Sequence, residues 1–123
     1  MSADPQPPGA LLRFVQLFNA GRYWASHEAL EDAWRRLDSG FYHGLILYAS
    51  AFVHARRGTR HGVLAQLEKA RRALEPHRPA HLGVDVDGIL AHADRCRALV
   101  EPREAPPAGA DEGWLGLLPR PRL

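Results

Sequence analysis

The stretch GLILYASAFV, residues 44–53, most constrains the fold of this chain. It contains no charged residue, and its apolar side chains do not alternate with polar ones. It is also only about half as long as the roughly 20 residues that a membrane-spanning helix needs. A segment that is apolar on nearly every side is typical of a helix surrounded by other helices. We therefore expect residues 41–57 to form the central helix of a small bundle, ended by Gly58.

Four further segments show the helical period, because their apolar residues recur every three or four positions. The expected helices run from residue 10 to the turn at 19–21, from 23 to 37, from 61 to 74, and from a cap at Asp85 or Asp87 to about 100. No segment alternates as a half-buried strand would. The expected fold class is all-α, a single bundle of about five helices around a central apolar helix.

The two ends of the chain differ in composition from this helical domain, which we place at residues 10–100. Residues 1–9 are polar and proline-rich and are expected to be a disordered leader. Residues 101–123 are rich in Pro and Gly and are expected to be mobile for most of their length. This tail contains a short apolar cluster, Trp114 to Leu118. The cluster either packs loosely on its own domain or docks onto a partner, and composition leaves both open.

Composition limits the setting of the protein. The single cysteine, Cys96, excludes an internal disulfide framework, and the N-terminal sequence lacks the basic and apolar regions of a secretory signal. Together with the absence of a membrane-spanning segment, this predicts an intracellular, cytoplasmic protein. The formal net charge is +2, and fifteen of the sixteen basic residues are arginine, which we attribute to a GC-rich genome.

Several motifs occur in a fixed order: FNAGRYWASHEALEDAWRRL, then GLILYASAFVHARRG, and later LGVDVDGIL. In this order they resemble the domain-of-unknown-function family numbered 309, whose members are small helical proteins of bacteria and archaea. The matching positions are Asn19, Gly21, Tyr23 or Trp24, His27, Glu28, Leu30, Glu31, Trp34, Gly44, Leu45, Ile46, His54, Gly58, Gly83 and Asp85. The resemblance implies a multihelical, bacterial-type domain without an established activity. Two features depart from the family: His43 stands where glutamine is frequent, and the tail is an addition.

The segment HEALE, residues 27–31, resembles the His-Glu-x-x-His zinc motif, with Glu31 in place of the second histidine. On a helix, His27, Glu31 and Trp34 share one side, where Leu30 and Leu37 are expected to enter the core. A histidine and a carboxylate four residues apart can chelate a divalent ion. Glu28 is then a candidate general base.

Further ligands have to come from the central helix, where His43, Ser50 and His54 share one side. We expect His27, Glu31 and His54 to meet, with Ser50 in reach. They then form either a hydrogen-bonded structural cluster or a site for a divalent metal ion. A metal-free pocket for a small molecule is a third reading, in which the core aromatic Trp34 is one wall.

Three function classes follow. A non-catalytic module that binds a small ligand, a protein partner or a second copy comes first, because no complete catalytic motif is present. A divalent-metal-assisted, hydrolase-like enzyme using the His/Glu cluster is the alternative. The third class binds phosphate or nucleic acid through the arginines near the connection of the third and fourth helices, but interleaved acidic residues and the lack of a stacking surface argue against nucleic acid. These arginines are Arg56, Arg57, Arg60, Arg71 and Arg72.

Overall fold

The computed structural model describes residues 9–108 and 112–123. The predicted leader, apart from Gly9, lies outside the described residues. The elements are α1 (Gly9–Asn19), α2 (Tyr23–Leu37), α3 (Gly40–Arg57), α4 (Arg60–Leu74), η1 (Glu75–His77), β1 (Ala80–His81), β2 (Val84–Asp85), α5 (Val86–Val100) and η2 (Gly113–Gly116). The all-α prediction is confirmed, and the predicted helices match α1 to α5 to within about a residue at each end.

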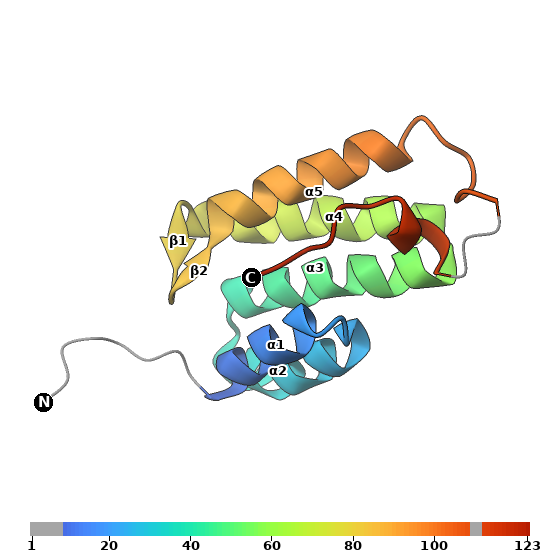
Figure 1. Cartoon of the computed structure of the whole chain (residues 1–123). Helices are drawn as coiled ribbons and strands as arrows, with labels where there is room; N and C mark the ends of the chain where they lie inside the picture. Colours follow the sequence, from blue (N-terminus) through green and yellow to red (C-terminus); the bar gives the residue numbers. More distant parts are fainter. Residues whose placement is uncertain (1–8, 109–111) are drawn as a thin grey trace, which may run out of the picture.

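The helices are arranged around α3, as predicted from its apolar sequence (Figure 1). The α1–α2 hairpin covers one side of α3, and α4 packs along the other side. α5 lies on the side of α3 that is opposite the α1–α2 hairpin, and it packs on α4. The tail then returns across the front of the molecule between α3 and α5 (Figure 1). None of the described helices has the length and hydrophobicity that a membrane span requires.

The helix ends follow from local chemistry. Gly58 ends α3 in the left-handed region, with φ of 78°, where a side chain would be strained, and its amide donates to the Ala55 carbonyl. Asp85, one of the two predicted caps, begins α5 by accepting a hydrogen bond from the Gly88 amide at 2.9 Å. The other candidate, Asp87, instead pairs with Arg78 at 2.6 Å. The choice between the two caps is therefore settled in favour of Asp85.

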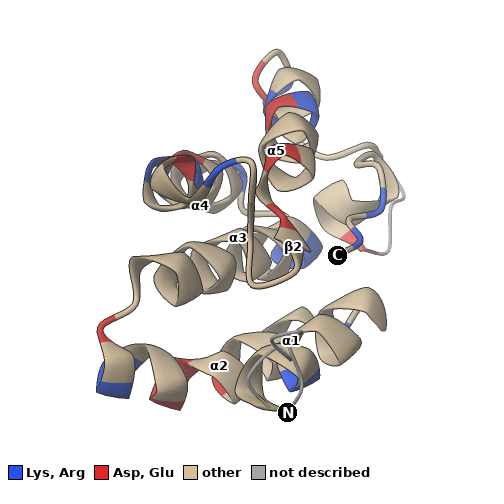
Figure 2. Ribbon diagram, turned by 90° about the vertical axis from the view of Figure 1, so that its left-hand side faces the viewer, with Lys and Arg blue, Asp and Glu red and all other residues tan. Residues whose placement is uncertain are grey.

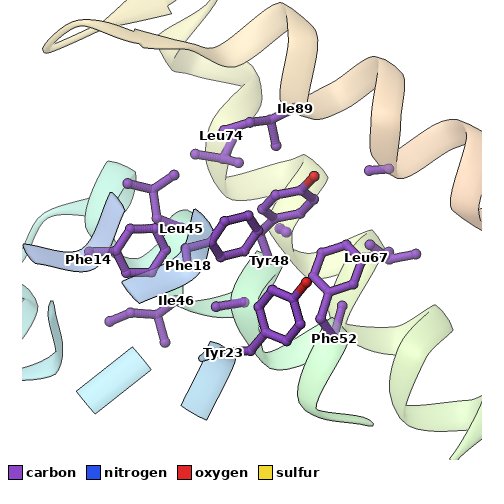
Figure 3. Close-up of a cluster of buried hydrophobic side chains, with 14 of the residues drawn as sticks. Phe14, Phe18, Tyr23, Leu45, Ile46, Tyr48, Phe52, Leu67, Leu74 and Ile89 are labelled. Atoms are coloured by element: carbon purple, nitrogen blue, oxygen red, sulfur yellow. The ribbon is translucent and has the colours of Figure 1, made fainter. Parts of the chain in front are cut away.

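Aromatic rings from three helices meet in the centre of the core (Figure 3). Phe18 of α1 contacts Tyr23 of α2 and both Tyr48 and Phe52 of α3, with ring centroids 5.2–5.9 Å apart. Each such ring buries on the order of 150–250 Å², so this cluster joins the α1–α2 hairpin firmly to α3. Charged residues lie mainly outside, and most of α3 carries none (Figure 2).

The close contact between α3 and α4 depends on two glycines. A Cβ atom at Gly44 would lie 2.6 Å from Leu74, and one at Gly62 would lie 2.2 Å from the ring of His54. Real Cβ atoms do not approach other atoms so closely, so any larger residue would push the helices apart.

Two parts of the chain differ from the predictions. Residues 80–85 form a two-residue antiparallel strand pair, which is too short to show alternation in the sequence. Residues 112–123 pack against the domain: Trp114 is fully buried and Leu118 is 8% exposed. The apolar cluster of the tail is visible in the sequence, but its spacing does not predict how deeply it is buried.

Candidate functional site

The side of α2 that faces the core is not the predicted one. Its buried residues are Tyr23, Ser26, Leu30 and Ala33. Successive helical residues are turned by about 100°, so His27 and Glu31, which follow two of these positions, lie at the edge of the interface. Leu37 is 64% exposed and does not enter the core. The side of α2 that was predicted to face the core is therefore rotated about the helix axis from the side that does face it.

The predicted cluster of His27, Glu31 and His54 is not assembled. Glu31 pairs with Arg35 of its own helix at 2.6 Å. The ring of His54 packs on Gly62 of α4, away from α2. The Nδ1 atoms of His27 and His54 are both buried and have no hydrogen-bond partner among the described residues.

The structure also brings no three His, Cys, Asp or Glu side chains within the described ranges into a position to hold one metal ion. Among the described residues, His27, Glu31 and His54 therefore do not form a three-ligand metal site. The reason is geometric, because α4 occupies the side of α3 on which His54 lies.

The remaining predicted residues are divided between separate contacts. Trp34 is half-buried and stacks on His43, with ring centroids 4.4 Å apart. Trp24 stacks on His27 at 5.0 Å, and Trp24 is 54% exposed. Glu28 is exposed and Ser50 half-buried. Trp34 with His43 and Trp24 with His27 thus form two separate stacked pairs.

The predicted arginine cluster is mostly engaged in structural contacts. Arg60 of α4 donates to the carbonyls of Glu101 and Arg103, both at 2.8 Å, and so holds the end of α5. Arg71 pairs with Asp94 at 2.9 Å. Arg60 and Arg71 of the cluster are thus held by contacts within the domain.

A different polar cluster lies in the interior, between α3, α5 and the tail. The His92 Nε2–H donates to the Pro119 carbonyl at 2.7 Å, because that oxygen can only accept. Neutral His92 then accepts at Nδ1 from the Tyr48 hydroxyl, also at 2.7 Å. The Cys96 Sγ lies 3.6 Å from the same Nδ1. All three side chains are buried.

Burial keeps each of these three groups uncharged. It raises the pKa of the Tyr48 phenol well above its ordinary value and lowers the pKa of His92. It also raises the pKa of the Cys96 thiol to about 12. The thiol is therefore protonated near neutral pH and is a poor nucleophile.

The tail is held in place at both of its ends. At one end, Gly113 and Trp114 lie against the C-terminus of α3, where Trp114 is fully buried. At the other end, the Asn19 side chain donates to the Leu123 carbonyl at 3.0 Å and accepts from the Leu123 amide at 2.8 Å. Arg120 adds a hydrogen bond to the Asn19 carbonyl at 3.0 Å. Residues 112–123 are thus a fixed wall of the domain.

Between this wall and α5 runs a surface groove, which we call the α5–tail groove and define by residues 85–99 and 117–123. One section is a hollow of about 350 Å³. Its basic lining residues are Arg95, Arg120 and Arg122. Asp85 also lines this section, and the floor is formed by Tyr48 and His92 together with Gly88, Ile89 and Leu123.

The side chains that line this section include three arginines and one carboxylate, so they carry a net positive charge. Among the described residues, Arg95, Arg120 and Arg122 take part in no ion pair, whereas Asp85 is engaged in capping α5. A concave surface of one sign of charge attracts ligands of the opposite sign.

This groove was not predicted from the sequence, although the position of one histidine in α5 indicated part of it. His92 lies between Ile89 and Cys96 at helical spacing, so it belongs to the inward side of α5. A buried histidine requires partners, and its partners here come from α3 and the tail. Arg120 and Arg122 had no such signal, because their place depends on how the tail folds back.

Comparison with known proteins gives one result. No curated protein and no solved structure matches this chain. The family described as "Domain of unknown function (DUF309)" matches residues 11–65, which include most of α1, all of α2 and α3, and the start of α4. α5 and the tail, and with them both walls of the α5–tail groove, lie outside the matched range. The resemblance to this family that the sequence motifs indicated is therefore confirmed over residues 11–65.

Proposed function

We propose that this domain is a non-catalytic module that binds a small anionic ligand in the α5–tail groove. The observation that carries the proposal is the convergence of Arg95, Arg120 and Arg122 on one hollow of about 350 Å³. That volume lies within the range of small-molecule sites, roughly 300–1,000 Å³. Arginine is also well suited to binding carboxylates and phosphates, because its planar fork donates two parallel hydrogen bonds.

The floor of the groove supports binding rather than catalysis. A general base or nucleophile needs a pKa close to the working pH. Tyr48 and Cys96 have pKa values raised by burial, and both nitrogens of His92 already have hydrogen-bond partners. Tyr48 and His92 give the hollow an uncharged floor, with Cys96 beside His92, and the charge is supplied by the arginines that line it.

The test is a titration with inorganic phosphate and with acetate at constant ionic strength, followed by NMR of the arginine Nε–Hε groups. We expect saturable shifts at Arg95 and Arg122. Arg36 is the control, because it lies on α2 and pairs with Asp32 at 3.1 Å. In the double variant Arg95→Gln/Arg122→Gln the remaining shifts should no longer saturate. Arg120 is left unchanged, since it anchors the tail to Asn19.

Equal, non-saturating shifts at Arg36 and Arg95 would show only general screening of surface charge and would refute the proposal. Retention of saturable binding by the double variant would refute the assigned site.

A further inference from the structure

The α5–tail groove continues beyond its charged section. A second hollow of about 530 Å³ adjoins it and shares Arg95 as a lining residue. The other residues around it are aliphatic: Ala98, Leu99, Leu117, Leu118 and Pro119. Within the described part of the chain, no acidic side chain and no aromatic ring lines this second section.

The two sections lie end to end along one side of α5. Gly88, His92, Arg95 and Leu99 are spaced by four, three and four residues and therefore share one flank of the helix. At 1.5 Å per residue this flank extends for about 16 Å. The tail runs in the opposite direction, since residues 117–119 accompany the Leu99 end and residues 120–123 accompany the Gly88 end. The tail passes along α5 in this way in Figure 1.

We propose that the ligand is an amphiphilic anion, an acyl chain that ends in a single carboxylate. This inference rests on the proposed function and specifies its ligand class. The carboxylate is held by Arg95 and Arg122, and the chain lies along the aliphatic section beside Leu99. A nucleotide fits this groove less well, because the aliphatic section offers no aromatic face for a base.

The chain length of the ligand should govern its affinity. Burial of one methylene group contributes about 0.8 kcal/mol, which corresponds to about fourfold in the dissociation constant. Leu99 and Leu117 are half-buried, so the groove is open on one side. We therefore expect about two- to fourfold tighter binding for each added methylene.

The experiment compares acetate, hexanoate and octanoate, each below its micelle concentration, by the same arginine NMR titration. The wild-type protein should bind octanoate most tightly and acetate most weakly. Leu99→Asn should flatten this series while it preserves the response to acetate. The exposed position Ala98 allows a second variant, Ala98→Glu, which brings a carboxylate beside the chain without disturbing the core. Leu12→Asn, at an exposed position on α1, is the matched control.

The outcomes separate the two proposals. A rising series that both groove variants flatten, and that Leu12→Asn leaves intact, supports the amphiphilic ligand. Equal binding of all three acids overturns this inference but leaves the anion site standing. Binding of octanoate without shifts at Arg95 and Arg122 overturns it as well. A protein whose arginines respond to no anion refutes the proposed function itself.

Discussion

Replacement of Trp114 by alanine tests whether the tail is part of the folded core. Trp114 is fully buried against the end of α3. An aromatic side chain of this size buries on the order of 150–250 Å², and at about 25 cal/mol per Å² its burial is worth about 4–6 kcal/mol. The indole N–H has no hydrogen-bond partner among the described residues, which offsets about 1–3 kcal/mol of this gain. We expect Trp114→Ala to lower the free energy of unfolding by about 3 kcal/mol.

The assay is urea denaturation followed by far-ultraviolet circular dichroism. With a slope of about 2 kcal/mol per molar urea, the expected loss lowers the midpoint by about 1.5 M. Trp114→Phe should cost less than the alanine variant, because it retains most of the apolar area and removes the unpaired N–H. Trp24→Ala is the control, since Trp24 is 54% exposed and its loss should change stability by no more than about 0.5 kcal/mol. Similar midpoints for Trp114→Ala and Trp24→Ala would refute the reasoning.

Three further predictions use the same denaturation assay or a simple labelling experiment. Gly113→Ala should lower the free energy of unfolding by about 2 kcal/mol or more, because φ is +55° and the added Cβ would lie 2.5 Å from the Ala55 carbonyl oxygen. Gly21→Ala is the control: its φ is +78° but its nearest contact is at 3.9 Å, so it should lower that free energy by only about 1 kcal/mol, and equal losses in the two variants would contradict the prediction. Cys96, with its pKa raised to about 12, should resist a thiol reagent at pH 8 until the protein is unfolded in urea; rapid native labelling would show that the tail leaves α5. Burial lowers the folded-state pKa of His92, His43, His54 and His77 below 6.5, so the unfolded chain binds protons first as the pH falls. The free energy of unfolding should therefore fall as the pH is lowered from 6.5 towards those folded-state values, and an unchanged urea midpoint between pH 7 and 5 would argue against buried, neutral rings.

The helices could be predicted from the sequence because their signals are local. Apolar spacing, the Gly58 stop and the Asp85 cap each act over a few residues, and each was found where it was expected. The central position of α3 also followed from its own composition, since a helix that is apolar on most sides has to be covered.

The site could not be predicted in the same way, because it depends on how the helices are rotated. A shift of the buried side of α2 by one residue position moved His27 and Glu31 from the expected core to its edge. Spacing showed that His54 shares a side with Ser50, but not that α4 covers His54. The arginines of the groove come from α5 and the tail, and no local pattern connects those two segments.

The clamp between Asn19 and Leu123 has a consequence for the synthesis of the protein. The two residues are 104 positions apart, and a ribosome adds about 5–20 residues per second, so Asn19 is made roughly 5–20 s before its partner. During that time α1 to α4 can already pack, since their contacts join segments that are close in sequence. The Pro119 carbonyl that accepts from His92 is also made late. Until residues 112–123 are made, the parts of α3 and α5 that they cover in the folded domain are open to a chaperone or to another apolar chain segment.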